Sequence, residues 1–332
     1  MSIVIGDIVV PTAVLLAPMS GVTDQPFRRL VRSFGAGLVV SEMIASQAMI
    51  RQTRESMKMS SGCADDYPMA VQLAGADPMV MAEAARLNLD RGAALIDINF
   101  GCPVKKVVNK ACGSALMREP GLAAKIVAAV VDAVSPVPVT VKMRLGWDED
   151  QRNAPEMARL CELSGAQLVT VHGRTRAQLY NGSADWTAIR AVRDAVNVPV
   201  VANGDIQTLP DVDAALAQSG ADGVMIGRGV YGRPWFIRDA IRHLAGETAM
   251  PPPQGRNLGA LVAEHYDAIL GHYGIHVGVR IARKHLSWYA KAGNLGPAFR
   301  AAVNAENEPD AVFELIERSF AGSPMTTPAL AA

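Results

Sequence analysis

The sequence predicts an α/β protein built as a closed (β/α)8 barrel, the TIM-barrel fold, followed by a small all-helical C-terminal domain. Eight strands, seven of them followed by a helical stretch, can be traced within about 245 residues, the size that such a barrel needs. The predicted strands are continuous apolar runs, as expected for parallel strands that helices cover on both faces. A doubly wound open sheet is the main alternative, but no G-x-G-x-x-G motif follows the first strand to support it.

The predicted elements alternate regularly along the chain, after a short hairpin at residues 3–10. Apolar runs predict the eight strands at 14–19, 38–43, 69–74, 93–99, 138–143, 167–172, 198–203 and 221–226. Helices are predicted at 25–33, 78–90, 120–134, 155–164, 186–196, 210–219 and 234–244. Asp24 precedes the first helix as its N-cap, and Asp77-Pro78 opens the second by the rule of a capping residue followed by proline.

A proline-rich stretch from Met250 to Gly255 interrupts this alternation and predicts a domain boundary. We therefore expect a barrel at residues 1–248, a linker at 249–254 and a helical domain at 255–332. Beyond the linker, apolar residues recur only at helical spacing. They are Leu258, Leu261, Val262, His265, Ile269 and Leu270 on one face, and Val312, Leu315, Ile316 and Phe320 on another.

The composition excludes several classes of protein. Lys plus Arg and Asp plus Glu each total 32, so an RNA site would need basic residues concentrated on one side. The four cysteines Cys63, Cys102, Cys112 and Cys161 form no C-x-x-C pair, and no histidine cluster has zinc spacing, so no metal site is predicted. The chain shows neither a basic leader with an apolar core nor an apolar run that could span a bilayer, which predicts a cytoplasmic protein.

Polar residues follow the predicted strands, and in a barrel such residues converge on one mouth. In strand order they are Ala17-Pro18-Met19-Ser20; Ser41-Glu42-Met43; Gln72; Asn99 and Cys102; Lys142 and Arg144; His172-Gly173-Arg174; Asn203-Gly204-Asp205; and Gly227-Arg228-Gly229. The loops after the seventh and eighth strands are a recurrent phosphate site, and their glycines let backbone N–H groups approach an anion.

The polar residues at these strand ends together predict a binding site for a mononucleotide-like cofactor. The amide of Gln72 can read the edge of a heterocycle, and Lys142 places a cation in the mouth. FMN fits this set, because a positive charge by flavin N1 and the C2 carbonyl stabilises the anionic reduced ring.

Six short motifs in order resemble the tRNA-dihydrouridine synthase family. The opening motif is Ala17-Pro18-Met19-Ser20-Gly21-Val22-Thr23-Asp24-Gln25-Pro26-Phe27-Arg28, and the catalytic loop is Asn99-Phe100-Gly101-Cys102-Pro103. The other four are Val141-Lys142-Met143-Arg144, His172-Gly173-Arg174-Thr175-Arg176, Asn203-Gly204-Asp205-Ile206 and Ile226-Gly227-Arg228. Phe100 departs from the small or aliphatic residue expected there. Arg280-Ile281-Ala282-Arg283-Lys284-His285 suggests the bacterial B-type branch.

The resemblance implies an FMN enzyme that reduces the C5–C6 bond of selected uridines in tRNA, with NADPH recharging the flavin. Cys102 would be the general acid. The implied cofactor contacts are Pro18, Met19, Ser20, Gln72, Lys142, Asn203, Gly204, Asp205, Gly227 and Arg228, with His172 against the flavin.

The chemistry of such a reduction explains two residue types independently. Hydride delivery to C6 of uracil leaves negative charge at C5 and O4, so an acid must reach C5 from the face opposite the flavin. A thiol with a pKa near ~8.5 is mostly protonated at neutral pH, and Cys102 can serve. Asn99 can hold the uracil edge. A base inside a folded tRNA must be flipped out to reach the site, which would explain a helical domain that grips RNA.

Basic residues supply the remaining predicted substrate contacts. Each of them could instead be a solvent-exposed charge without a role in binding. The predicted substrate contacts are Asn99, Lys105, Lys106, Arg144, Arg174, Arg176, Arg280, Arg283 and Lys284. Cys102 could likewise be a buried structural thiol, and His172 a core histidine.

Two other functions remain open at this point. A flavin barrel could instead act on a free pyrimidine or another small alkene, or a barrel without catalysis could bind RNA. No protein partner is predicted.

Overall fold

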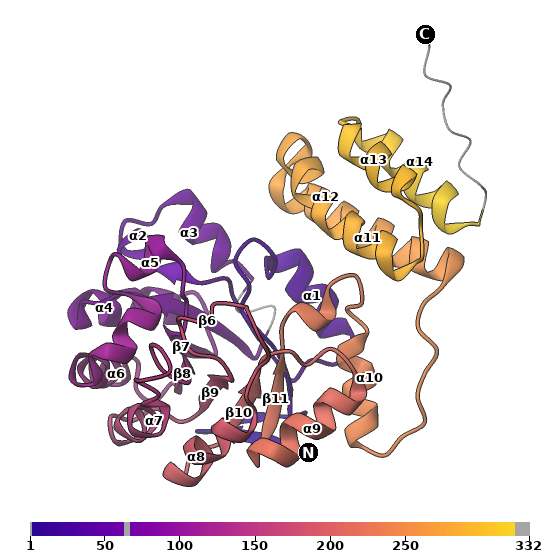
Figure 1. Cartoon of the computed structure of the whole chain (residues 1–332). Helices are drawn as coiled ribbons and strands as arrows, with labels where there is room; N and C mark the ends of the chain where they lie inside the picture. Colours follow the sequence, from indigo (N-terminus) through magenta and orange to yellow (C-terminus); the bar gives the residue numbers. More distant parts are fainter. Residues whose placement is uncertain (1, 63–66, 323–332) are drawn as a thin grey trace. The chain divides into compact units, whose positions relative to one another are not determined.

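The computed structural model describes residues 2–62 and 67–322 (Figure 1), so the last ten residues of the predicted helical domain lie outside the described part. The chain forms two compact units. The first runs to Gly229 and includes Ile237–Glu247; the second consists of Val230–Phe236 and the chain from Thr248 onward.

The first unit is a closed parallel barrel. Its strands are β3 (Val14–Leu16), β4 (Leu38–Val40), β6 (Met69–Ala74), β7 (Leu95–Phe100), β8 (Val139–Arg144), β9 (Val169–His172), β10 (Val200–Asn203) and β11 (Gly223–Ile226). Each strand pairs in parallel with its neighbours, β11 pairs with β3, and the β4–β6 pairing completes the ring. The predicted (β/α)8 barrel is confirmed.

The second strand was predicted as one continuous run over residues 38–43, but in the structure it is shorter and is followed by a separate strand. Ser41, Glu42 and Met43 separate β4 from a two-residue strand, β5 (Ile44–Ala45), which pairs with the end of β6. The Ser41 hydroxyl accepts from the Gln72 backbone N–H at 3.0 Å and donates to the Glu42 carbonyl at 2.8 Å. A side chain therefore replaces part of the backbone ladder at this rim.

Helices cover the outside of the barrel (Figure 1). They are α1 (Gln25–Ser33), α4 (Pro78–Leu89), α6 (Pro120–Val134), α7 (Ala154–Leu163), α8 (Thr187–Ala195), α9 (Leu209–Ser219) and α10 (Phe236–Leu244). The predicted caps of the first two helices form: Asp24 accepts from Phe27 N–H at 3.0 Å, and Asp77 from Met79 and Val80 at 2.9 and 3.1 Å.

Short helices occupy the longer loops. Between β5 and β6 the structure adds α2 (Ser46–Ile50) and α3 (Arg54–Met59), where the sequence predicted none. The loop after β7 carries α5 (Lys105–Val108) and the 3-10 turn η1 (Gly113–Arg118), and η2 (Arg228–Val230) follows β11.

The hairpin β1 (Ile3–Ile5) and β2 (Ile8–Val10) belongs to the barrel core. Its inward side chains join one buried cluster with residues near the strand starts, including Leu15, Leu38 and Leu168. The amino end of the barrel is thereby filled with apolar side chains, and the polar strand ends lie at the carboxyl mouth.

The second unit is helical, with α11 (Gly255–Tyr273), α12 (Ile275–Ala292), α13 (Pro297–Ala305) and α14 (Pro309–Phe320). Leu258, Val262 and Ile269 are buried on one predicted face, and Val312, Ile316 and Phe320 on the other. The segment Val230–Phe236 belongs to this unit, and the Tyr231 ring stacks on the Trp288 ring with 3.9 Å between the ring centroids. Within the described ranges, no helix combines the length and the apolar character that crossing a bilayer requires.

Candidate active site at the carboxyl mouth of the barrel

Strand register brings the predicted site residues together. Gln72 pairs with Asp97 between β6 and β7, and Asn99 pairs with Lys142 between β7 and β8. His172 pairs with Arg144 on one side and with Asn203 on the other. Five neighbouring strands therefore deliver their polar ends to one rim, as the sequence predicted.

The loop that carries Cys102 is held by hydrogen bonds to its backbone. The Cys102 N–H donates to Asn99 Oδ1 at 2.8 Å, and the Cys102 carbonyl accepts from the N–H and the hydroxyl of Ser114 at 3.1 and 3.0 Å. Gly113 lies so close, at φ +61°, that an added Cβ would stand 2.8 Å from the Cys102 carbonyl oxygen. Burial raises the pKa of the Cys102 thiol, which keeps it protonated at neutral pH.

A buried polar chain lies behind this loop. Gln72 Nε2 donates to Asp97 Oδ2 at 2.7 Å, and Asn99 Nδ2 donates to Gln72 Oε1 at 2.8 Å. Thr140 donates to the other Asp97 oxygen at 2.7 Å. Sequence reasoning assigned no role to Asp97, although a carboxylate inside an otherwise apolar strand, two residues before Asn99, was a usable signal.

Lys142 points its ammonium group toward the last strands. Its Nζ donates to Asn203 Oδ1 at 3.0 Å, and Asn203 Nδ2 donates to the Met225 carbonyl at 2.7 Å. Burial and the neighbouring Arg144 lower the pKa of Lys142 to about 8, against the attraction of Asp97. Lys142 thus remains mainly cationic at neutral pH while facing the mouth.

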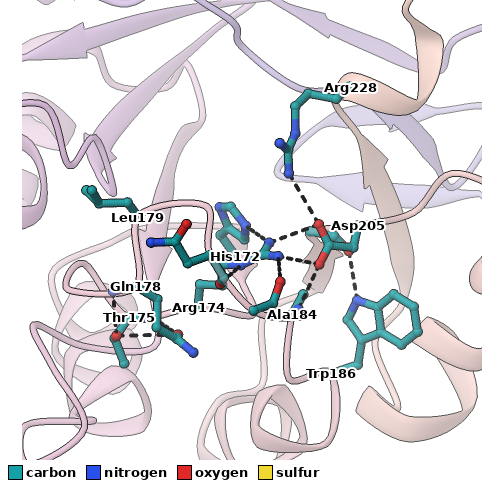
Figure 2. A network of polar contacts seen from close by, with 12 residues as sticks. His172, Arg174, Thr175, Gln178, Leu179, Ala184, Trp186, Asp205 and Arg228 are labelled. Atoms are coloured by element: carbon teal, nitrogen blue, oxygen red, sulfur yellow. Dashed lines mark hydrogen bonds and ion pairs between the residues drawn. The ribbon is translucent and has the colours of Figure 1, made fainter.

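Arg174 does not have the exposed position that a substrate contact requires. Its side chain is buried, and all five N–H donors go to internal acceptors (Figure 2). Nη1 and Nη2 reach the two Asp205 oxygens at 2.9 and 2.5 Å, and other donors reach the Asn181 and Gly182 carbonyls at 3.1 and 2.7 Å. The predicted contact between Arg174 and a substrate phosphate would therefore require Arg174 to give up one of these internal partners.

The carboxylate of Asp205 is likewise occupied by hydrogen bonds within the protein. Its carboxylate also accepts from Arg228 at 3.3 Å and from the Ala184 N–H at 2.8 Å. Partial burial acts to raise the pKa of Asp205, but the hydrogen bonds from Arg174 and Ala184 outweigh it and hold that pKa below its usual value. The carboxylate therefore has no lone pair left for a cofactor, and only the Asp205 backbone can make the predicted contact.

The same arginine decides the tautomer of His172. Arg174 Nη1 lies 3.3 Å from His172 Nε2 (Figure 2), and a guanidinium can only donate. Nε2 is then the unprotonated acceptor, which places the ring proton on Nδ1. Burial and four surrounding cations hold the pKa of His172 well below its usual value, so the ring is neutral.

Glycines complete the rim beside this histidine. Gly204 has φ +115°, and an added Cβ would stand 2.8 Å from the His172 ring, so only glycine fits. Trp186 Nε1 donates to the Gly204 carbonyl at 2.9 Å (Figure 2). Gly227 faces Ala17 and Met19, with room for an ordinary contact, so the first and last strand ends adjoin. Pro18 and Met19 are half-buried there, and Ser20 is exposed.

The remaining predicted substrate residues fall into two groups. Arg144 is buried and donates to the Gly101, Thr175 and Leu179 carbonyls at 2.9, 2.8 and 2.8 Å. These hydrogen bonds use Nε and Nη1, and none of them uses Nη2. Arg283 donates to the Glu306 carbonyl at 2.9 Å and to Asn307 at 3.0 Å, so it braces the turn between α13 and α14.

The second group is more accessible. Lys105, Lys106 and Arg280 are exposed, Lys284 is half-buried, and Arg176 lies over the Trp147 ring at 4.4 Å. Sequence reasoning missed Tyr180, whose half-exposed ring lies under Arg228 at 5.1 Å and Arg144 at 5.6 Å. No local pattern distinguishes this tyrosine from an ordinary loop residue.

These residues fit FMN by the chemistry of their donors. A cation (Lys142), an amide N–H (Gln72) and an imidazole N–H (His172) suit the carbonyl-rich edge of a flavin, and the side chain of Arg228, with 47% exposed, suits a phosphate. In the parts of the chain that the structure describes, no group of three or more metal-ligating side chains was found.

Arg174 provides a test of the buried ion pair. Replacing Arg174 by methionine is expected to lower the free energy of unfolding by roughly 3–5 kcal/mol, because Asp205 would lose its buried partner. Arg228→Met is the matched control: its partner is the same carboxylate, but its own side chain is half-exposed, so a loss of about 0–1 kcal/mol is expected. Urea denaturation of both variants measures the contrast, and equal losses would refute the distinction.

Asp97 predicts a pH dependence of stability. Burial raises the pKa of Asp97 from 3.8 to about 6. The folded state therefore binds more protons than the unfolded state between these values, and stability falls as pH rises through this window. The expected loss is roughly 3 kcal/mol relative to Asp97→Asn, which cannot ionise. Urea denaturation at pH 4 and pH 7 checks it; the facing charge, Lys142, titrates above this window. Parallel curves for the two proteins would contradict the prediction.

Comparison with known proteins shows the family to which this chain belongs. Residues 15–321 match the family model "Dihydrouridine synthase (Dus)". The chain is 55% identical to a probable tRNA-dihydrouridine synthase of Rickettsia bellii over 313 residues, covering 94% of this chain and 96% of the relative. It is 48% identical to tRNA-dihydrouridine synthase B of Xanthomonas axonopodis pv. citri, covering 95% of each.

Solved structures are similar in fold alone. An old yellow enzyme homologue from Zymomonas mobilis aligns with a TM-score of 0.53 at 14% identity, over 75% of this chain and 93% of that one. Histamine dehydrogenase from Rhizobium sp. 4-9 aligns with a TM-score of 0.58 at 13% identity, over 80% and 50%. The match to the family model over nearly the whole chain, together with relatives near half identity, identifies this protein as a member of the dihydrouridine synthase family.

Proposed function

We propose that this protein is a tRNA-dihydrouridine synthase that reduces the C5–C6 bond of specific uridines in tRNA, with FMN as cofactor and NADPH as reductant. One observation carries the proposal: a protonated thiol, Cys102, is anchored to Asn99 at the same rim as Lys142 and Gln72. The relatives are named as tRNA-dihydrouridine synthases, and these names support tRNA as the substrate.

The proposed cofactor contacts follow the rim. Lys142 and the second N–H of Gln72 would hold the flavin carbonyl edge, with His172 Nδ1–H beside them. Gly227, Arg228 and the backbone of Gly204 and Asp205 would hold the phosphate, and Pro18, Met19 and Ser20 would line the first strand end. FMN, when bound, would supply the hydride from N5 to C6 of uracil.

The chain's own groups would complete the reduction. Cys102 would give its proton to C5, since burial keeps the thiol protonated and the Asn99 and Ser114 contacts fix its loop. Arg144 would hold the loop from the other side through the Gly101 carbonyl. Asn99 would hold the base by its amide.

The proposed RNA contacts are the exposed basic residues Lys105 and Lys106, which follow Cys102 on α5, and Arg280 on α12. We propose the same division of labour that the sequence predicted: a catalytic barrel at 1–248, a linker at 249–254 and a helical tRNA-binding domain at 255–332. The reaction would take place in the cytoplasm, where tRNA is found.

Position-resolved mapping of dihydrouridine in tRNA tests the proposal. A strain lacking the gene, with any paralogues also removed, is expected to lose dihydrouridine at defined positions, and the gene restores it. Purified protein with FMN and NADPH should form dihydrouridine in unmodified tRNA. Turnover of free uracil or uridine without turnover of tRNA would favour the small-alkene alternative, and tRNA binding without flavin would favour a non-catalytic protein.

A further inference from the structure

The buried chain of Asp97, Gln72 and Asn99 has a direction that both of its ends impose. At one end Asp97, when ionised, offers only acceptors, so Gln72 must turn Nε2 toward it and Oε1 away. At the other end the Gly101 and Cys102 N–H groups offer only donors, so Asn99 must turn Oδ1 toward them, at 3.1 and 2.8 Å. The two requirements meet consistently between Asn99 Nδ2 and Gln72 Oε1 at 2.8 Å.

This direction limits what Asn99 can offer a ligand. Its carbonyl oxygen has two lone pairs, and two backbone N–H groups already take them. One N–H of its amide goes to Gln72, so the only group left for a base is the second N–H. Asn99 cannot pair with a base by donating and accepting at once, as an unconstrained asparagine does.

We propose that Asp97 is a positioning residue: acting through Gln72, and together with the two backbone N–H groups of the Cys102 loop, it holds Asn99 in the donor-only orientation. The site then accepts a base with a carbonyl at the position of uracil O4 and rejects a base with an amino group there, as in cytosine. The inference rests on the proposed function, because it assumes that a pyrimidine enters this mouth. Two donors facing each other, the Asn99 amide and the cytosine amine, leave both unpaired, and a buried unpaired donor is unfavourable.

Two substitutions at position 97 distinguish the effect of a hydrogen-bond acceptor from the effect of side-chain size: asparagine keeps an acceptor for Gln72, and leucine has none. In Asp97→Asn the backbone N–H groups of the Cys102 loop still dictate the direction, and the new amide oxygen can accept from Gln72. In Asp97→Leu no acceptor remains for Gln72 Nε2, so Gln72 can turn Nε2 toward Asn99. That orientation opposes the one that the backbone N–H groups favour, and Asn99 Nδ2 loses its fixed acceptor, Gln72 Oε1. Thr140→Val removes the other hydrogen bond to Asp97 without touching Gln72, and it is the matched control.

The experiment uses the full-length protein loaded with FMN and two tRNA transcripts. The reacting uridine is first mapped with the wild-type protein, and the second transcript carries cytidine at that position. Dihydrouridine formation gives kcat/KM, and fluorescence anisotropy gives the affinity for each transcript. Thermal unfolding and the flavin absorption spectrum report whether each variant is folded and loaded.

The expected results form a pattern. Wild-type protein and Thr140→Val should bind the uridine transcript at least about 10-fold more tightly than the cytidine transcript. Asp97→Asn should keep this preference and stay within about 5-fold of the wild-type kcat/KM, while its thermal stability at pH 7 rises. Asp97→Leu should lose the preference and about 100-fold in kcat/KM.

Three outcomes would overturn the inference. The first is an Asp97→Leu protein that keeps the uridine preference. The second is an Asp97→Asn protein that loses it, because an acceptor at position 97 would then be insufficient. The third, which applies even if Asp97→Leu does not fold, is an Asn99→Asp protein with wild-type preference, since aspartate has no N–H to donate. A wild-type protein that reduces no uridine in tRNA would instead refute the proposed function.

Discussion

Replacing Cys102 by alanine is expected to reduce the rate of dihydrouridine formation by about 10²–10⁴-fold, the usual contribution of a general acid. The flavin should be retained, because none of the proposed cofactor contacts involves the Cys102 side chain. The loop should keep its position, since Asn99 and Ser114 hold the backbone of residue 102 rather than its sulfur. The loss should therefore fall on turnover and leave transcript affinity nearly unchanged. Single-turnover oxidation of the reduced enzyme by tRNA measures the affected step directly.

Cys112→Ala is the matched control for this variant. Cys112 is also a half-exposed thiol in the same loop region, and burial also raises its pKa, but its thiol donates to the Lys110 carbonyl, at 3.1 Å, and has no part in the proposed reaction. Wild-type turnover is expected for Cys112→Ala. Full activity of Cys102→Ala would remove the proposed acid, and loss of flavin from it would show that the thiol has a structural role instead.

Replacing Lys142 by methionine is expected to weaken FMN binding by about 10–100-fold, which corresponds to the loss of one hydrogen bond to a charged group. Methionine preserves most of the apolar stem, so the packing around β8 should survive. Asn203 keeps its hydrogen bond to the Met225 carbonyl and with it the end of β10. Flavin fluorescence quenching on titration with FMN measures the dissociation constant.

A control variant and a second expected result make the Lys142 prediction specific. Lys125→Met changes an exposed lysine on the outer helix α6 and should leave FMN affinity unchanged. The cation should also favour the anionic reduced ring, so the Lys142 variant should hold a flavin that is harder to reduce. Unchanged FMN affinity and unchanged flavin reduction together would contradict the contact.

The barrel and most of its mouth could be predicted because both depend on one-dimensional patterns. A parallel strand covered on both faces must be a largely continuous apolar run, and the polar residues at the end of that run mark the carboxyl end. Gln72, Asn99, Lys142, His172 and Asn203 were found by that rule alone, and register then aligned them. The division of the second strand was missed because the Ser41 hydroxyl, which is no part of the apolar pattern, replaces a ladder contact.

Which polar group each side chain contacts was decided only by the tertiary structure. Arg174 and Asp205 are 31 residues apart, and their pairing depends on two loops folding toward each other. A loop arginine in a sequence is equally compatible with solvent, phosphate or a carboxylate, so the sequence could not show that the Arg174 donors go to Asp205 and to loop carbonyls. Asp97 was passed over for the same reason: it is linked to Asn99 by hydrogen bonds through Gln72, on a different strand.

The sequence alone thus determined the barrel, its mouth and the thiol Cys102 within it, because strand periodicity and the order of strand ends are local properties. Only the tertiary structure decided that Asn99 donates to Gln72 and accepts from the Cys102 loop, that His172 carries its proton on Nδ1 and that Arg174 faces inward. The direction of a hydrogen bond depends on both partners, and in the folded protein those partners come from different strands.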